Sequence, residues 1–266
     1  MKVFISADIE GTNGIVDWTE TEQKYTQYEY FAKKMTMEVG QVCEAINSVN
    51  DNAEIYVKDA HDTGRNLDHS LLPENVILNR RWSGHPYKMM ANIDKSYDAA
   101  IMTGYHSGEG SNGNNLAHTM TRQITHFTIN GERCSEFLMN YYTALYEGVP
   151  VVLVSGDKAL CEFVKKIDEN IYTVEALEGW GGSVIARHPS VVLEELYEKT
   201  VAALKNKEKM KLSLPDKFQI ELSFREHREA LRAAFYPGVY KINDHTIGFE
   251  TIDYFEFLRM YTFVVV

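Results

Sequence analysis

The first half of the chain alternates short apolar runs with longer stretches of helical periodicity. Residues 2–7 form an apolar run, and apolar side chains then recur at intervals of three and four from 28 to 49. Further apolar runs follow at 54–57, 99–103 and 151–154. Strands that alternate with helices are typical of an α/β layer fold. The pattern therefore predicts a mixed, mostly parallel sheet flanked by helices.

A hairpin and a capped helix are expected in the middle of the chain. Asn130 and Gly131 lie between the segments 126–129 and 132–134, which is a strong signal for a two-residue hairpin. Ser135 has the character of a helix N-cap, so we expect a helix from 136 to about 146. Further helices are expected over 157–167 and 189–206.

The pattern changes past Pro215, where strands and helices no longer alternate regularly. We expect a strand over 218–224, a helix over 225–235, a hairpin over 239–251 and a closing helix over 254–266. These elements predict a smaller α+β unit over residues 212–266, packed on an α/β domain over residues 1–204. The lysine-rich stretch 205–211 is the expected linker, although its charges could equally form a solvated helix end.

Composition excludes several classes of protein. The 27 basic and 38 acidic residues give a formal charge of −11, which argues against nucleic acid as a partner because phosphate binding needs a basic face. No segment approaches the ~20 apolar residues that span a bilayer, and the N-terminus lacks a secretory h-region. Three widely spaced cysteines without a CxxC pair indicate reduced thiols. We expect a cytoplasmic protein with no membrane partner.

Side chains that can bind a metal follow three of the predicted strands. Asp8 and Glu10 follow the first strand with i, i+2 spacing, which points both carboxylates to one side. His61 follows the second strand and His106 the third. The carboxyl ends of strands carry the ligand site in open α/β sheets. Imidazole with carboxylate is a normal ligand set for zinc, so we expect a zinc site at this edge.

Glu136 has two interpretations, and its position alone leaves both open. It either completes the metal site or complements the dipole of the helix that it opens. With Glu136 the site has five ligands, more than one tetrahedral catalytic zinc needs if a water is to remain. Five ligands fit two metals about 3.5–4 Å apart that share a bridging carboxylate. Asp8 is our choice for the bridge.

His118 follows a segment rich in glycine, which could fold over the site. Spacing alone favours a solvent-facing loop histidine over a catalytic one. Asp59, Asp62 and Asp157 also lie at strand ends, where each could orient a ligand histidine, receive a substrate ammonium or cap a helix. The other histidines are interpreted as structural: His69, His85, His126, His188, His227 and His245. The chain has no P-loop or HExxH motif, and GWGGS lacks the GxSxG order of a serine hydrolase.

Five short motifs, in order, resemble those of the D-aminopeptidase family, peptidase family M55. They are ADIEG with Asp8 and Glu10, KDAH with His61, GYH with His106, AHTM with His118 and NGERCSE with Glu136. Their order and intervals match from residue 1 to about 160. One departure concerns the stretch ALEGWGGSVIARHPS, where Glu178 and Trp180 replace basic residues of the family. This departure puts the family's substrate preference in question for this chain.

The resemblance implies zinc ligands at Asp8, Glu10, His61, His106 and Glu136. It also implies a catalytic role for His118, as base, acid or nucleophile, and we prefer proton transfer. The implied activity is release of N-terminal D-amino acids from short peptides and amides. The implied assembly is a ring-shaped homodecamer, with the C-terminal unit contributing to contacts.

The combined interpretation is a dinuclear zinc-dependent aminopeptidase with two Zn²⁺ per chain, which attacks its substrate through a water activated by the metals. An amino-acid amidase or another metallohydrolase on the same site is the alternative. A non-catalytic, metal-dependent peptide-binding protein is a further alternative, against which the presence of His118 argues.

Overall fold

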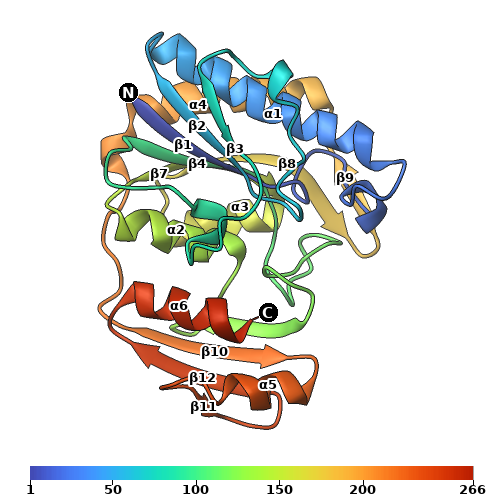
Figure 1. Cartoon of the computed structure of the whole chain (residues 1–266). Helices are drawn as coiled ribbons and strands as arrows, with labels where there is room; N and C mark the ends of the chain where they lie inside the picture. Colours follow the sequence, from blue (N-terminus) through green and yellow to red (C-terminus); the bar gives the residue numbers. More distant parts are fainter. Residues whose placement is uncertain (266) are drawn as a thin grey trace.

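The computed structural model describes residues 1–265 and arranges them around two β-sheets. The larger sheet has seven strands, and the smaller one has five strands and lies below it in Figure 1. Helices flank the larger sheet on both faces. The expected α/β fold, a mixed and mostly parallel sheet flanked by helices, is therefore confirmed.

The larger sheet is parallel except at one edge. Its strands, in spatial order, are β3 (Val76–Asn79), β2 (Glu54–Asp59), β1 (Lys2–Ala7), β4 (Ala99–Tyr105), β7 (Val151–Asp157), β8 (Tyr172–Trp180) and β9 (Ser183–Ala186). Among the strand pairs described for this sheet, only β8 with β9 is antiparallel. Ala7 of β1 lies opposite Asp59 of β2 and Thr103 of β4, so the carboxyl ends of these three strands meet at one edge.

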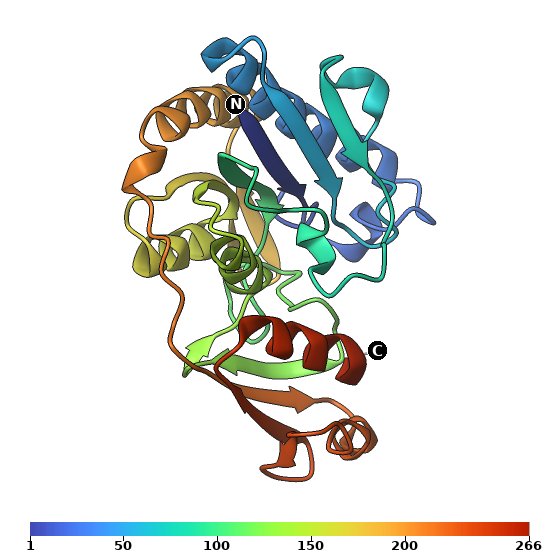
Figure 2. The same cartoon turned by 60° about the vertical axis from the view of Figure 1, so that its left-hand side comes forward.

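Four helices cover the two faces of this sheet. Helices α1 (Tyr28–Val49) and α4 (Pro189–Lys205) pack on one face, and α2 (Glu136–Tyr146) and α3 (Lys158–Ile167) on the other (Figure 2). Side chains of β1 alternate between the two cores: Val3 and Ile5 pack with α1 and α4, whereas Phe4 packs with α2. A slip by one residue would exchange Phe4 with Val3 and Ile5 between two differently packed cores, which disfavours any other register at the carboxyl end of β1.

The smaller sheet joins segments that are far apart in the sequence. Its strands, in spatial order, are β11 (Tyr240–Lys241), β12 (Thr246–Thr251), β10 (Phe218–Phe224), β5 (Ile124–Ile129) and β6 (Glu132–Arg133). All of its pairs are antiparallel. The C-terminal segment therefore completes its sheet with two strands from the middle of the chain. A division of the chain into two domains near 205–211 stays a prediction.

Helix α6 (Tyr254–Val264) lies between the two layers (Figures 1 and 2). It contacts α2, where the hydroxyl of Tyr254 donates to the carbonyl of Met139 at 2.5 Å. A further short helix, α5 (His227–Ala233), packs on β10 and β12. The C-terminal elements are thus attached to the large sheet through α2 as well as through the covalent chain.

The predicted elements agree with the structure most closely where their signals were strongest. The helices over 28–49 and 136–146 and the strands over 2–7 and 218–224 have the predicted bounds. Ser135 caps α2 as expected, accepting from Leu138 N at 3.3 Å. Strands β3, β8 and β9 were not predicted, and α5 is shorter than expected. The last residue of the predicted closing helix, 266, lies outside the described residues.

Short 3-10 helices connect the larger elements: η1 (Trp18–Glu20), η2 (His69–Leu71), η3 (Lys88–Met90) and η4 (Lys207–Lys209). Within residues 1–265, no helix combines the length and the apolar character that crossing a membrane requires.

Candidate active site

Three strands of the larger sheet deliver ligand-type side chains to the same edge. Asp8 follows β1, His61 lies two residues past β2, and His106 follows β4. The N–H of Asp8 donates to the carbonyl of Thr103 at 2.9 Å, which continues the pairing of β1 with β4 beyond the strand end. The sheet register therefore brings Asp8 and His106 side by side.

Two glycines allow this close approach. Gly104 has φ +67°, and a Cβ there would meet the carbonyl oxygen of Asp8 at 2.2 Å. A Cβ at Gly11 would meet the carbonyl oxygen of Tyr105 at 1.7 Å. Any side chain at either position would separate the two segments, because real Cβ atoms essentially never approach within 3.0 Å.

The five predicted ligands lie together and are buried. Nδ1 of His61 lies 3.4 Å from Oδ1 of Asp8 and 3.0 Å from Oε2 of Glu10. Nε2 of His106 lies 3.5 Å from Oδ2 of Asp8 and 3.5 Å from Oε1 of Glu136. Asp8 thus lies between the two imidazoles, with one oxygen facing each.

Backbone carbonyls orient both imidazoles. Nε2 of His61 lies 2.9 Å from the carbonyl of Thr21, and Nδ1 of His106 lies 3.0 Å from the carbonyl of Ser107. Because a carbonyl only accepts, each of these nitrogens carries the hydrogen. In the neutral ring, the opposite nitrogen points its lone pair into the cluster, as in metal-binding histidines.

Several buried atoms of the cluster lack hydrogen bonds. Oδ2 of Asp8, Oε2 of Glu10 and Nε2 of His106 form no hydrogen bond within residues 1–265 and face only other members of the cluster. Buried polar atoms are almost always hydrogen-bonded, so an unpartnered group of this kind needs an explanation. Carboxylate oxygens and imidazole nitrogens are zinc ligands, and a cation among them would satisfy all three. The donor set therefore fits the implied metal.

The electrostatics of the cluster also favour a cation. Burial alone would lower the pKa of His61 and of His106, but the nearby carboxylates, led by Glu10 for His61 and Glu136 for His106, raise both well above the usual range. Burial, with repulsion from Glu10, raises the pKa of Asp8 well above its usual range. Without a cation, the carboxylates thus favour the protonated forms of the two imidazoles. Metal binding would replace these protons.

Glu136 opens α2 with its side chain buried in the cluster. Its Oε1 accepts a hydrogen bond from the backbone N–H of Met120 at 2.6 Å. The side chain thereby ties the segment that carries His118 to the ligand cluster. A role toward the helix dipole is compatible with this position, but the side chain faces the other predicted ligands.

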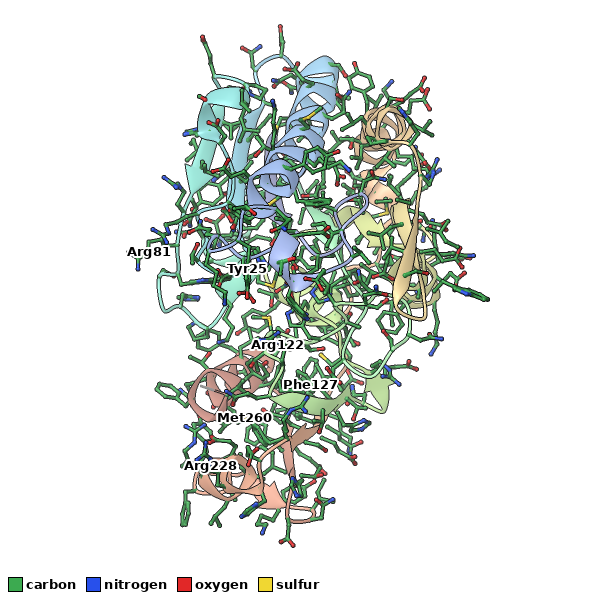
Figure 3. The ribbon with its side chains drawn as sticks, turned by 90° about the vertical axis from the view of Figure 1, so that its right-hand side faces the viewer. Tyr25, Arg81, Arg122, Phe127, Arg228 and Met260 are labelled. Atoms are coloured by element: carbon green, nitrogen blue, oxygen red, sulfur yellow. The ribbon has the colours of Figure 1, made fainter. Side chains whose placement is uncertain are left out.

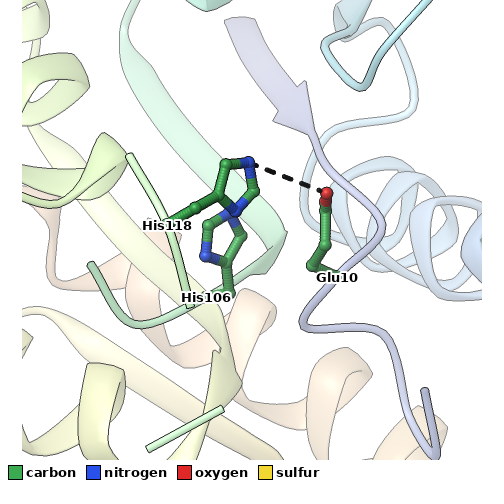
Figure 4. A group of neighbouring side chains, drawn as sticks. All are labelled: Glu10, His106 and His118. Atoms are coloured by element: carbon green, nitrogen blue, oxygen red, sulfur yellow. Dashed lines mark ion pairs between the residues drawn. The ribbon is translucent and has the colours of Figure 1, made fainter. Parts of the chain in front are cut away.

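His118 lies inside the cluster and does not face solvent. Only 12% of its side chain is exposed, and its Nε2 lies 3.5 Å from Glu136 and 3.9 Å from Glu10 (Figure 4). Its ring stacks on His106, with centroids 4.4 Å apart and an interplanar angle of 4°, and meets the edge of Trp18. Nδ1 of His118 lies 2.9 Å from the carbonyl of Leu116. The interpretation favoured by spacing alone, a solvent-facing loop histidine, is therefore wrong.

Comparison with known proteins identifies the chain that carries this cluster. A family model described as D-aminopeptidase, peptidase family M55, matches residues 1–263. The chain belongs to the D-aminopeptidase family. The resemblance inferred from the five motifs is thereby confirmed, and with it the expected class of enzyme, a peptidase.

A sequence comparison and a structure comparison support the match to the D-aminopeptidase family along the whole chain. A D-aminopeptidase of Bacillus subtilis (strain 168) is 31% identical over 263 residues, which cover 96% of this chain and 93% of the relative. A solved structure, described as the Zn-dependent D-aminopeptidase DppA from Bacillus subtilis, a self-compartmentalizing protease, is 27% identical with a TM-score of 0.92. That match covers 99% of this chain and 96% of the solved one.

The three strand-end aspartates of this D-aminopeptidase-family chain organise its loops. Asp157 caps α3 and accepts from the N–H of Ser107 at 2.6 Å, which anchors the residue after His106. Asp59 accepts from Asn66 and Leu67. The carbonyl of Asp62 accepts from Trp82 Nε1 at 2.6 Å. The helix-cap interpretation is therefore correct for Asp157. Backbone carbonyls, and not these aspartates, contact Nε2 of His61 and Nδ1 of His106.

A cavity of about 810 Å³ opens over the cluster. Asp8, Glu10, His61, His118 and Glu136 line one part of it. The remaining wall comes from five separate stretches of the chain, and its members include Trp18, Lys24, Trp82, Lys88, Arg122 and Thr262. Figure 3 shows Arg122 at the level where the upper layer meets the lower elements that carry Phe127 and Met260. The site therefore lies between the two layers of the molecule.

The sequence pattern did not predict these wall residues. Most of them lie between the main helices and strands, without the strand-end position of the predicted ligands. Thr262 comes from α6, which packs over the site only because of the tertiary fold. One signal was available: Trp18 lies in the turn after the ADIEG motif, and aromatic side chains commonly line ligand cavities.

Proposed function

We propose that the chain is a zinc-dependent aminopeptidase that releases N-terminal D-amino acids from short peptides or amides. The observation that carries the proposal is the convergence of two imidazoles and three carboxylates beside a cavity, with buried atoms that lack hydrogen bonds. Membership of the D-aminopeptidase family and the description of a similar structure as Zn-dependent support the metal and the reaction.

Two zinc ions per chain are the proposed content, held by Asp8, Glu10, His61, His106 and Glu136. These five donors are more than one tetrahedral catalytic zinc needs. Asp8 has one oxygen near His61 and the other near His106, which supports it as the shared ligand. Zinc bound there would polarise the scissile carbonyl and lower the pKa of a coordinated water.

His118 is the proposed group for proton transfer. Its Nδ1 carries the hydrogen, because Leu116 offers a carbonyl that can only accept, so Nε2 holds the lone pair in the neutral ring. Burial, assisted by the nearby His106, lowers the pKa of His118, which favours this neutral form. Nε2 would take a proton from the attacking water and return it to the leaving amine. Such transfer typically contributes ~10²–10⁴-fold.

A homo-oligomer, by our proposal a homodecamer, is the working assembly. The description of a similar structure as a self-compartmentalizing protease supports an assembly. Large apolar side chains in the C-terminal segment, Phe235, Ile252 and Phe263, are 82%, 83% and 64% exposed, which supports burial against other copies. A cytoplasmic location stays a prediction, to which the three free, buried cysteines are suited.

A substrate panel with zinc-reconstituted protein tests the proposed function. Matched D- and L-aminoacyl amides and dipeptides would be assayed beside elemental analysis of the same preparation. We expect close to two zinc ions per chain and faster release of D- than of L-amino acids. Bound zinc without turnover of any member of the panel would overturn the peptidase proposal in favour of peptide binding alone.

A further inference from the structure

Besides histidines, three cationic side chains line the cavity: Lys24, Lys88 and Arg122. Two of them are exposed, so water hydrates their charge. The ammonium of Lys24 lies 2.6 Å from the carboxylate of Glu22 and is 67% exposed. The guanidinium of Arg122, an exposed residue, lies over the ring of Trp18 at 4.7 Å. Neither cation needs a ligand to compensate its charge.

Lys88 differs from both. It is half-buried, and within residues 1–265 its ammonium forms no ion pair and no hydrogen bond; it lies 5.4 Å from the ring centroid of Tyr261. Burial lowers the pKa of Lys88, and no carboxylate offsets this effect. A charged group that has lost part of its hydration without gaining an anionic partner is stabilised when an anion enters.

The backbone around Lys88 is held firmly relative to the ligand cluster. Lys88 opens η3 with φ +47°, an uncommon conformation for a residue other than glycine. The next residue, Met89, is buried, and its carbonyl accepts from Oγ of Ser6 in β1 at 2.9 Å. Asn140 of α2 donates to its sulfur. The elements that carry Asp8 and Glu136 therefore also position Lys88.

We propose that Lys88 binds the C-terminal carboxylate of the peptide substrate and so makes the enzyme prefer short peptide acids to their amides. The inference rests on the proposed function. An aminopeptidase substrate carries its cationic amine at one end and, when it is an unmodified peptide, a carboxylate at the other. The scissile bond lies at the acidic cluster, so the far end of a short peptide meets the cavity wall. A dipeptide spans only about 7 Å at roughly 3.3–3.6 Å per residue, so this end stays within the cavity.

The direct test compares D-alanyl-D-alanine with its C-terminal amide, using zinc-loaded protein. We expect kcat/KM to favour the acid by about ten- to hundredfold, the range of a charge-assisted hydrogen bond. In Lys88→Met this ratio should fall to near one, mainly through a raised KM for the acid. Lys88→Arg, which keeps the charge, should keep most of the preference. Lys24→Met is the matched control, because it removes a lysine of the same cavity, and it should keep the ratio.

A binding measurement provides a readout that does not depend on turnover. The probes are reduced-bond analogues of the dipeptide acid and amide, in which CH₂ replaces the scissile carbonyl, and calorimetry gives their Kd values. The acid should bind the wild-type protein at least about tenfold more tightly, and Lys88→Met should abolish this difference.

The outcomes separate this inference from the proposed function. Equal kcat/KM and equal Kd for acid and amide in the wild-type protein would overturn the role of Lys88 and leave the peptidase intact. This comparison needs no variant, so it also decides the question if Lys88→Met fails to fold. A ratio unchanged in a folded Lys88→Met would likewise overturn it. No hydrolysis of either substrate by zinc-loaded protein would overturn the proposed function, and this inference with it.

Discussion

Two regions of the molecule contain opposite kinds of atom without partners. One is the edge of the large sheet where Asp8, His61 and His106 meet, here called the ligand edge, and the other is the C-terminal segment. At the ligand edge, polar atoms of Asp8, Glu10 and His106 are buried without hydrogen bonds. In the C-terminal segment, apolar side chains such as Phe235 and Ile252 are more than four-fifths exposed. Buried polar atoms favour a cation, whereas exposed apolar atoms favour another protein surface. The two regions therefore need partners of different chemistry, and substitutions should perturb them separately.

The largest effect is expected from removing a ligand. His61→Ala and His106→Ala should each lose zinc and reduce activity to the detection limit, because the metal site loses a donor and the acidic cluster keeps its repulsion. Elemental analysis and peptide hydrolysis measure both consequences. The matched control is His85→Ala, which removes a histidine of the same cavity that lies outside the cluster. Retained zinc in both ligand variants would contradict the site.

The next effect concerns proton transfer within the same region. His118→Ala should keep its zinc and its oligomeric state but lose at least ~10²-fold in kcat, the low end of general acid–base contributions. Zinc content and turnover are measured on one preparation. Full activity would exclude a catalytic role, and lost zinc would make His118 a ligand, as its place in a cluster with Glu10 and His106 would allow.

The C-terminal segment should respond in assembly while metal binding is unchanged. Phe235→Ser combined with Ile252→Ser should shift the oligomer towards smaller species, since each apolar side chain buried at a contact contributes about 1.5–3 kcal/mol. Light scattering against the 30.5 kDa mass of one chain measures the shift. Ile77→Ser is the control, because Ile77 is a 59% exposed apolar residue on β3 of the large sheet. Loss of zinc in the double variant would contradict the independence of assembly and metal binding.

The smallest effect is expected from a buried carboxyl group outside both regions. Burial raises the pKa of Glu38 to about 7, against the opposing effects of the Asn13 N–H and Lys34. The folded protein thus binds a proton that the unfolded chain, with a pKa near 4.5, releases, so stability falls as pH rises between these values. Glu38→Gln should raise the free energy of unfolding by about 1–3 kcal/mol at pH 8 and by little below pH 4.5.

Urea unfolding at fixed protein concentration, repeated at several pH values, measures this difference. Glu44→Gln is the matched control, because Glu44 lies on the same helix and is exposed. A stability gain from Glu38→Gln that is equal at pH 5 and pH 8 would contradict the shifted titration.

Local sequence signals predicted the ligand edge well, because its geometry follows from strand ends that lie next to one another. Once β1, β2 and β4 are placed in a parallel sheet, Asp8, His61 and His106 meet at one edge. Spacing failed for His118, since its orientation depends on the Leu116 carbonyl and on the ring of His106. The pairing of β5 with β10 and the approach of Thr262 to the cavity depend on contacts between distant segments. No local pattern encodes such contacts.

The glycines at positions 11 and 104 have a practical meaning for engineering this enzyme. Neither contributes an atom to catalysis, yet the space that they leave empty lets Asp8 and His106 share a site. Libraries that aim to alter substrate choice should keep both glycines fixed and diversify the cavity wall, where Trp18, Trp82 and Lys88 offer side chains to exchange. In distant homologues, loss of either glycine beside the five predicted ligands would mark a site in which Asp8 and His106 no longer meet, so the proposed metal site would be lost.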